Sequence, residues 1–195
     1  MSKNVLLCGV GGQGTILASK LMAAAAMDKG IHVLSAETIG MAQRGGSVTS
    51  HVRMGDNLYS PLIGRGQADI ILGFEPGEVV RTLPFLKKGG LVTVSTRPVR
   101  PVTGSLTGTD YTGLEMINYI KSKVEHVITV DAVRASADLG SSKVLNVVLL
   151  GTAISSGMLD IDKNDIKKAI LKKIPTKFQE LNLHAIDYMQ SHSFR

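Results

Sequence analysis

The chain is poor in aromatic residues and in cysteine. Its 195 residues include no tryptophan, four tyrosines and four phenylalanines. The core must therefore be aliphatic, and a platform on which nucleic-acid bases stack is not expected, so we predict no nucleic-acid partner. Cys8 is the only cysteine, which excludes an internal disulfide, a cysteine-ligated zinc site and an iron–sulfur cluster held by this chain.

Long hydrophobic runs are missing too. The longest apolar-rich run, residues 16–27, contains Ser19 and Lys20 and cannot span a bilayer. The apolar stretch that ends at Gly9 is too short for the core of a signal peptide. We therefore expect a cytoplasmic protein with no membrane contact. The length favours a single domain over residues 1–195.

Acidic residues are fewer than basic ones, and the formal net charge is +6. Much of the excess is a run of lysines near the C-terminus: Lys163, Lys167, Lys168, Lys172, Lys173 and Lys177. A solvated helix face explains such a run most simply, and docking of an acidic partner is the alternative.

The hydrophobic pattern predicts alternating strands and helices. A strand at 5–8, an Ala-rich helix at 15–29 and a strand at 31–35 read as a βαβ unit with a parallel pair of strands. Residues 47–54 alternate with a period of two, which predicts a half-exposed strand after a polar loop at 37–46. Further strands are predicted at 69–74, 91–94 and 126–130, and helices at 76–88, about 162–174 and about 176–192. The fold class is therefore α/β, a three-layer α/β/α domain with a mixed, mostly parallel sheet and C-terminal helices at about 162–192.

The segment Gly9-Val10-Gly11-Gly12-Gln13-Gly14, called the glycine turn below, fits G-x-G-x-x-G between the first strand and the first helix. Glycines permit positive φ and close approach of a ligand, and a helix N-terminus attracts anions. We therefore take Gly9, Gly11, Gly12, Gln13 and Gly14 as candidate anion-binding residues. The alternative is a tight turn that needs glycine for packing and binds nothing.

A second candidate is the loop from Glu37 to Gly46. If the glycine turn bound a dinucleotide, an acidic residue about twenty positions later would hold the ribose, and Glu37 fits loosely. Gln43 and Arg44 precede Gly45 and Gly46, so Arg44 can present a rigid cationic fork to phosphate or carboxylate. The alternative is that Arg44 pairs with Glu37 or with a partner chain and only holds the loop.

The motifs together resemble a known family. The glycine turn, the stretch 37–47, the strand 47–54 and the segment 60–63 look like the gamma-type subunit of 2-oxoacid:ferredoxin oxidoreductases. Within that family, residues 41–46 (Met-Ala-Gln-Arg-Gly-Gly) most resemble the small (beta) subunit of the indolepyruvate branch. The resemblance runs over nearly the whole chain and implies a Rossmann-like start of the type found in pyruvate:ferredoxin oxidoreductase domain III.

The resemblance implies one subunit of an enzyme that oxidatively decarboxylates an arylpyruvate to an acyl-CoA and passes electrons to ferredoxin. Thiamine diphosphate, Mg²⁺ and the iron–sulfur clusters are expected on a large (alpha) partner subunit, because the one cysteine and the lone Gly55-Asp56-Asn57 do not match the signatures of those sites. We expect no catalysis, cofactor or metal in this chain alone, CoA as co-substrate, and a heterodimer or heterotetramer.

Two other functions stay open from the residues. One is a gamma subunit of a pyruvate, 2-oxoisovalerate or 2-oxoglutarate ferredoxin oxidoreductase. The other is a stand-alone NAD- or flavin-dependent reductase that uses the same G-x-G-x-x-G motif. For the indolepyruvate interpretation, two roles of the glycine turn and of the loop from Glu37 to Gly46 stay open: they bind the CoA phosphates or the 2-oxoacid carboxylate, or they only seat the large subunit.

Overall fold

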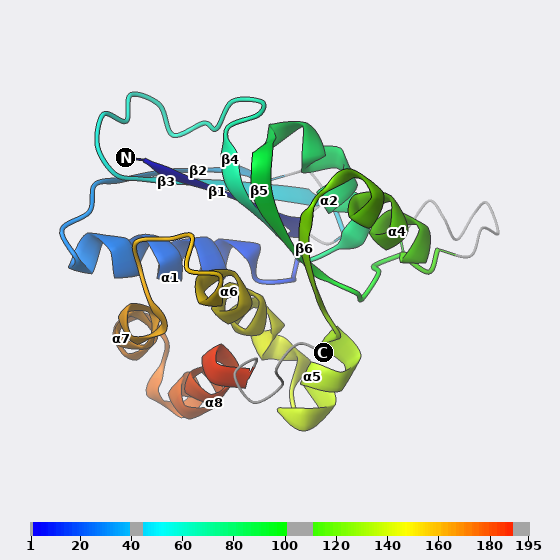
Figure 1. Ribbon diagram of the computed structural model, residues 1–195. Coiled ribbons are helices and arrows are strands. Elements are labelled where there is room, and N and C mark those ends of the chain that lie inside the picture. Colours follow the sequence, from blue (N-terminus) through cyan, green and yellow to red (C-terminus); the bar gives the residue numbers. More distant parts are fainter. Residues whose placement is uncertain (1, 40–44, 101–110, 189–195) are drawn as a thin grey trace.

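The computed structural model describes residues 2–39, 45–100 and 111–188 (Figure 1). The strands are β1 (Lys3–Val10), β2 (Val33–Ile39), β3 (Ser47–Met54), β4 (Ala68–Gly73), β5 (Leu86–Ser95) and β6 (His126–Val130). The α-helices are α1 (Thr15–Asp28), α2 (Pro76–Thr82), α4 (Leu114–Lys123), α5 (Ala132–Asp138), α6 (Leu145–Ser155), α7 (Lys163–Lys173) and α8 (Thr176–Asp187), and the short 3-10 helices are η1 (Leu83–Phe85) and η2 (Ser142–Val144).

The strands form one mixed sheet in the order β2-β3-β1-β4-β5-β6. β1, β4, β5 and β6 are parallel neighbours, whereas β3 is antiparallel to both β1 and β2. The prediction that the first two strands pair directly is wrong. β1 and β2 run in the same direction, but β3 lies between them and is hydrogen-bonded to both.

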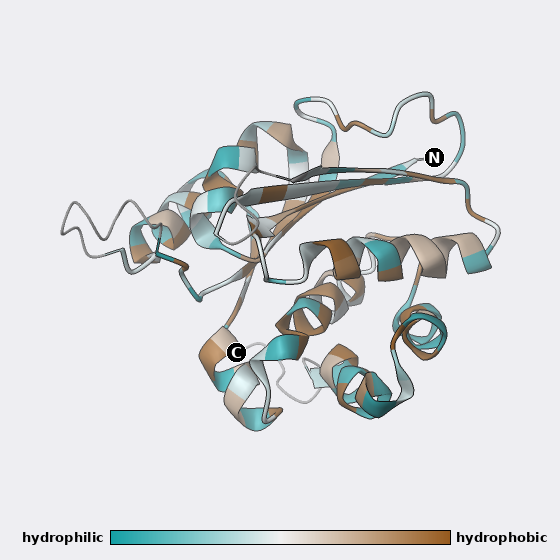
Figure 2. Cartoon of the chain, turned by 180° about the vertical axis from the view of Figure 1, so that it is seen from behind, coloured by the Kyte–Doolittle hydropathy of each residue, from teal (hydrophilic) through white to brown (hydrophobic). Residues whose placement is uncertain are grey.

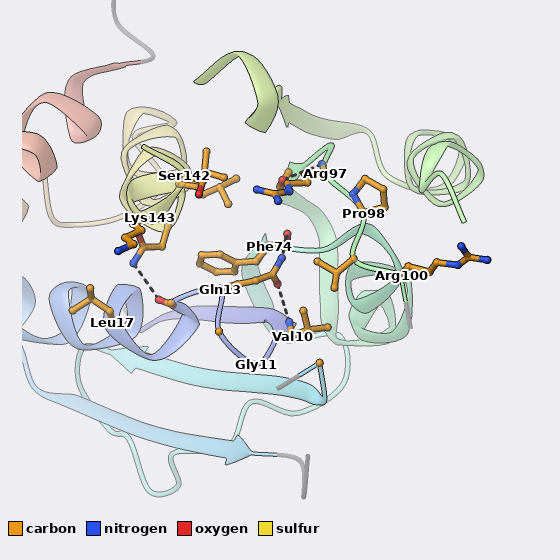
Figure 3. A pocket seen from close by; sticks show the side chains of 18 residues that line it. Val10, Gly11, Gln13, Leu17, Phe74, Arg97, Pro98, Arg100, Ser142 and Lys143 are labelled. Carbon is orange, nitrogen blue, oxygen red and sulfur yellow. Dashed lines mark hydrogen bonds between the residues drawn. The ribbon is translucent and has the colours of Figure 1, made fainter. Parts of the chain in front are cut away.

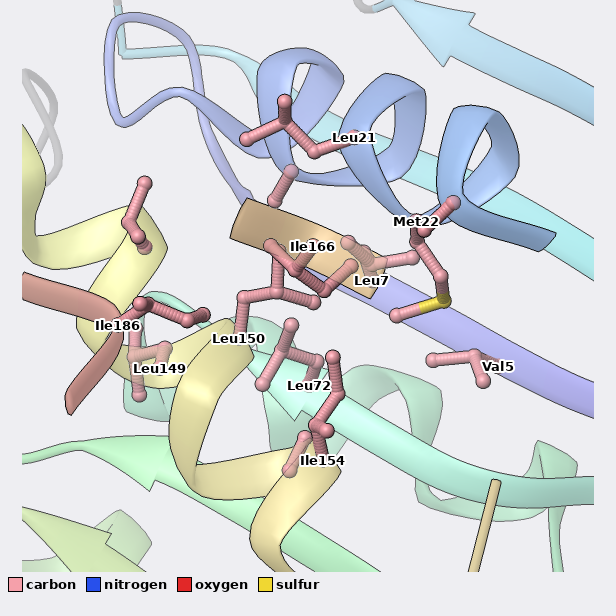
Figure 4. Packing of buried hydrophobic residues seen from close by; sticks show 14 of the residues in the cluster. Val5, Leu7, Leu21, Met22, Leu72, Leu149, Leu150, Ile154, Ile166 and Ile186 are labelled. Atoms are coloured by element: carbon pink, nitrogen blue, oxygen red, sulfur yellow. The ribbon is translucent and has the colours of Figure 1, made fainter. Parts of the chain in front are cut away.

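Two apolar layers cover the two faces of the sheet. In β1, Val5 and Leu7 belong to the larger core with α1 and α6, while Leu6 and Cys8 point into the smaller core with α2. Figure 4 shows the larger core, in which Leu7 lies among side chains of α1 and α6. α7 and α8 pack on the outside of α1 and α6 (Figures 1 and 2). The predicted α/β/α layering with a mixed, mostly parallel sheet is confirmed.

One predicted helix is much shorter than expected. The helix predicted at 76–88 ends at Thr82, because Pro84 has no N–H to continue the ladder and the chain passes through η1 instead. Gly89 and Gly90 do not end a helix. They lie inside β5, where the pairing with β4 shifts register between Ala68 and Ile70.

The second strand lies later than predicted. It spans Val33–Ile39 and not 31–35, so Glu37 belongs to the strand and not to the following loop. The strands predicted at 47–54 and 126–130 are confirmed with those bounds. His51 is buried in β3 in addition to the predicted inward residues, because the segment that follows β3 covers it: the backbone N–H of Ile63 donates to His51 Nδ1 at 3.1 Å.

In the part of the chain that the structure describes, no single helix is long and apolar enough to cross a bilayer. One bent pair, α5 with η2 and α6, passes the same test by length and composition alone.

Candidate functional site

A cleft of about 640 Å³ opens where β1, β4 and β5 end at the same side of the sheet (Figure 3). Such crevices beyond the carboxyl ends of parallel strands are the usual ligand sites of α/β folds. The glycine turn forms one wall of the cleft. The segment from Ser95 to Arg100, called the arginine wall below, forms a second, and the start of α6 with η2 forms a third.

The glycine turn is held by its own glutamine. The backbone N–H of Val10 donates to Gln13 Oε1 at 2.8 Å, and Gln13 Nε2 donates to the carbonyl of Phe74 at 3.0 Å. The side chain thus ties the end of β1 to the end of β4. A Cβ at Gly9 would lie 2.7 Å from Gln13 Oε1 and 2.8 Å from the Phe74 Cβ, so this arrangement requires glycine at position 9.

Gly14 is where the turn meets α6. Its φ is +82°, and a Cβ there would lie 2.6 Å from Asn146 Nδ2. That Nδ2 donates to the Gly14 carbonyl at 3.3 Å, which links residues 132 positions apart in the sequence. Glycine is therefore needed at position 14 for its backbone conformation and for the close approach of Asn146.

The end of the second loop, at Gly45 and Gly46, lies against the glycine turn. The Gly11 N–H donates to the Gly46 carbonyl at 2.9 Å, and Gly45 lines the cleft. The hydroxyl of Ser47 donates to Glu78 Oε2 of α2 at 2.6 Å, which fixes the start of β3. The candidates Gln43 and Arg44 lie outside the described residues.

Glu37 does not line the cleft. It lies in β2 with its Oε1 3.3 Å from Ser19 Oγ of α1. Because β3 separates β2 from β1, Glu37 is about 10 Å, two strand spacings, from the line of β1. A dinucleotide site needs the acidic residue on the strand beside β1, so this topology disfavours the ribose-binding role considered for Glu37.

Three helices begin near the cleft, and they differ in their caps. α1 begins after Gly14 and has no side-chain cap, whereas α6 continues directly from η2, whose first turn is capped by Ser141: the Lys143 N–H donates to Ser141 Oγ at 3.2 Å. α2 begins at Glu75, whose Oε2 accepts from the Glu78 N–H at 3.0 Å. A carboxylate of the protein itself thus occupies the anion position of α2, and of these three helices only α1 presents an uncapped positive end to the cleft.

The cleft is also lined by three cationic side chains that sequence reasoning did not select: Arg97, Arg100 and Lys143. None of the described lining residues is acidic. Figure 3 shows Arg97 over the cleft between Phe74 and Ser142, whereas Arg100 points away from the glycine turn. The sequence could have indicated Arg97, because this residue closely follows the strand predicted at 91–94, and ligands bind at the carboxyl ends of such strands.

A buried carboxylate fixes the arginine wall. Glu75, 3% exposed, accepts from the Tyr111 hydroxyl at 2.6 Å and from the Val99 N–H at 3.5 Å through Oε1. The Gly77 N–H donates to the Tyr111 oxygen at 3.1 Å. Burial, with the Glu75 carboxylate beside the phenol, raises the pKa of Tyr111 well above its usual range. The phenol therefore stays protonated and donates to Glu75.

The described residues offer poor ligands for metals. Among the described residues, no group of three or more His, Cys, Asp or Glu side chains could hold a metal ion. Cys8 is fully buried, and burial raises the pKa of its thiol to about 12, while the Thr82 hydroxyl bonded to its sulfur opposes that rise. Cys8 is therefore placed as a small buried hydrophobe of β1.

Comparison with known proteins gives a consistent result. Residues 4–189 match the family model described as pyruvate ferredoxin/flavodoxin oxidoreductase. The chain is 37% identical to indolepyruvate oxidoreductase subunit IorB of Pyrococcus horikoshii, covering 94% of this chain and 92% of the relative. It is 38% identical to the protein of that name from Archaeoglobus fulgidus, covering 95% and 92%.

Relatives with other names are less similar. The chain is 24% identical to the pyruvate/ketoisovalerate oxidoreductases common subunit gamma of Thermococcus kodakarensis, covering 92% of this chain and 90% of the relative. Among solved structures, it is similar to the gamma subunit of a keto/oxoacid ferredoxin oxidoreductase from Geobacter sulfurreducens. That match has 26% identity and a TM-score of 0.68 and covers 95% of this chain and 94% of the other.

Proposed function

The chain belongs to the pyruvate ferredoxin/flavodoxin oxidoreductase family as a gamma-type subunit of ferredoxin-dependent 2-oxoacid oxidoreductases, and we propose that it is the small subunit of an indolepyruvate oxidoreductase. The observation that carries this proposal is the difference in similarity between branches. Identity is 37% and 38% to two indolepyruvate subunits and 24% to a pyruvate/ketoisovalerate gamma subunit, over similar lengths.

The division of labour follows from what the residues can hold. Iron–sulfur clusters need several accessible thiolates, and this chain has one cysteine, whose thiol is buried with a pKa of about 12. The described carboxylates form no group suited to Mg²⁺. The residues do not fit thiamine diphosphate–Mg²⁺ or clusters, so we place these groups and the decarboxylation step on a large partner subunit.

For the cleft of this chain we propose a role in binding the phosphate groups of CoA. The uncapped N-terminus of α1 and the side chains of Arg97 and Lys143 surround a volume lined by no described acidic residue. Such a site favours a ligand with several negative charges. The carboxylate of the 2-oxoacid carries one charge and is the weaker candidate.

Reconstitution with the large subunit tests the assignment of the branch. The complex should reduce ferredoxin with indolepyruvate at a higher kcat/KM than with pyruvate or 2-oxoglutarate, and this chain alone should give no turnover. A preference for pyruvate or 2-oxoglutarate would assign the protein to another branch of the family and contradict the proposal. Turnover by the rigorously purified single chain would contradict the division of labour.

Calorimetric titration of the chain tests the role of the cleft. CoA should bind, and pantetheine, which lacks the phosphates, should bind much more weakly. NAD should not bind with micromolar affinity, because the strand beside β1 carries no ribose-binding acid in the Rossmann position. Micromolar NAD binding that is lost in Gly11→Val would favour the stand-alone reductase instead.

A further inference from the structure

Asn146 is a buried polar residue in the wall of the cleft. It lies in the first turn of α6, is 3% exposed, and lines the cleft beside Leu145 and Leu149. Its Nδ2 donates to the Gly14 carbonyl at 3.3 Å, but its Oδ1 is buried and accepts no hydrogen bond from the described residues. Buried acceptors in folded proteins nearly always have a donor, so this oxygen requires an explanation.

The bond to Gly14 determines which end of the amide has no partner. A main-chain carbonyl can only accept, so the amide nitrogen must face Gly14 and the oxygen must be turned away from it. Lys143, three residues before Asn146, also lines the cleft, yet its ammonium group does not bond to this oxygen. The cleft wall therefore contains an acceptor whose donor is not among the described residues.

The cleft around this acceptor combines apolar surface with exposed polar side chains. Figure 3 shows Leu17 and Lys143 at one end of the cleft, Arg100 at the other, and Phe74 between them. Ser142 and Lys143 are exposed, so they can rotate to admit a ligand. A flat aromatic base that carries N–H groups suits such a wall, because its faces contact apolar side chains and its edge donates hydrogen bonds.

We propose that the Asn146 carboxamide recognises the adenine base of CoA by accepting a hydrogen bond from its exocyclic amino group. The assignment rests on the proposed role of the cleft in CoA binding and adds the place of the base. Ionised phosphate oxygens only accept, so the phosphates cannot satisfy Oδ1. They are attracted instead by the uncapped N-terminus of α1, which begins next to Gly14 and is thus joined to Asn146 by one hydrogen bond.

Two features of CoA favour the base over the pantetheine arm, whose amides also donate. The adenine ring is rigid and loses little conformational freedom when it is held, whereas the amides belong to a flexible chain. CoA also carries a phosphate on the ribose beside the adenine. The ammonium group of Lys143, at the same end of the cleft, provides a positive charge for that phosphate.

The first experiment compares ADP with inosine diphosphate (IDP), which has the same ribose and phosphates. In IDP an oxygen replaces the exocyclic amino group, so an acceptor would face Asn146 Oδ1 in place of a donor. The full-length chain should bind ADP about fivefold more tightly than IDP, or more, in calorimetric titration. Equal affinities for ADP and IDP would overturn the proposal.

Two variants separate recognition of the base from support of the glycine turn. Asn146→Ala removes the acceptor and the bond to Gly14, so both affinities should fall and the ratio of ADP to IDP affinity should become about one. Asn146→Asp keeps an acceptor, so the preference for ADP should remain while the added negative charge weakens both ligands. A purely structural role of Asn146 would lower both affinities and leave the ratio unchanged in both variants.

Asn182→Ala is the matched control. Asn182 is 6% exposed, donates through Nδ2 to the Phe178 carbonyl at 2.7 Å, and does not line the cleft. Its variant should keep the wild-type ratio, and circular dichroism should show that each variant is folded.

The outcomes distinguish the adenine assignment from the proposed function. If CoA binds but Asn146→Ala keeps the preference for ADP, the adenine assignment is wrong and the role of the cleft stands. The same holds if Asn146→Ala weakens 4′-phosphopantetheine and leaves ADP unaffected, because the oxygen would then hold the pantetheine arm. A chain that binds none of CoA, ADP and inorganic pyrophosphate would contradict both proposals.

Discussion

The glycine turn and the arginine wall face the same cleft but are held in place by different means. The glycine turn is positioned by bonds between side-chain amides and the main chain, from Gln13 to Val10 and Phe74 and from Asn146 to Gly14. The arginine wall is a connecting segment whose shape depends on one buried carboxylate, Glu75, with Tyr111. We therefore expect damage to the glycine turn to cost folding stability, and damage to the arginine wall to cost mainly ligand affinity.

The largest effect should come from Gly14→Ala. Alanine would combine a positive φ with a Cβ placed 2.6 Å from Asn146 Nδ2. We expect a loss of about 2–4 kcal/mol in the free energy of unfolding, measured by urea denaturation. Gly30→Ala is the matched control, because Gly30 has φ +75° and no atom within 4 Å of the added Cβ. It should lose only about 1 kcal/mol. Equal losses in both variants would mean that the contact with Asn146 contributes nothing.

Gln13→Ala should have the next largest effect. It removes the acceptor of the Val10 N–H and the donor to the Phe74 carbonyl, both partly buried, at a cost of about 1–3 kcal/mol in unfolding free energy. Gln179→Ala also removes two bonds to carbonyls, of Leu171 and Ile174, but at a helix end near solvent. That control should cost clearly less. If Gln13→Ala is as mild as its control, the turn does not depend on its glutamine.

Arg97→Ala should show that the arginine wall contributes to ligand affinity and not to folding stability. The guanidinium lies over the cleft, so its loss should weaken CoA binding about tenfold in calorimetric titration while the urea midpoint stays nearly unchanged. Arg65→Ala removes an exposed arginine that does not line the cleft and is the control. A large fall in stability with unchanged CoA affinity would reverse the expected contrast between the walls.

The smallest effect should come from Tyr111→Phe, because Tyr111 does not line the cleft and affects the ligand only by positioning the arginine wall. It removes the 2.6 Å bond to Glu75 and leaves the Gly77 N–H without this partner, so the arginine wall loosens. CoA affinity should fall about threefold. Because the pKa of Tyr111 is raised well above its usual range, the ratio of wild-type to variant affinity should be constant from about pH 8 to pH 11, a range in which an ordinary tyrosine loses its proton. Tyr119→Phe, on the exposed face of α4, should change nothing. A ratio that varies with pH would show that Tyr111 ionises and contradict the buried bond.

The sequence alone was sufficient for features that depend on neighbouring residues. The alternation in 47–54 identified a strand, and its half-exposed pattern predicted a mixed sheet. The glycine spacing identified a turn at the start of a helix. These predictions succeeded because strand and helix periods and the conformational freedom of glycine are local properties.

Only the tertiary structure decided which distant segments meet. β3 lies between β1 and β2, so Glu37 in β2 is far from the glycine turn. The local sequence pattern does not determine which strands pair. Asn146 reached Gly14, and Tyr111 reached Glu75. Arg97 lines the cleft from the segment after β5, for which the sequence predicted no helix or strand. Pairing and packing between distant residues depend on the burial of whole faces and on hydrogen bonds between elements, so they are settled only when the chain is folded.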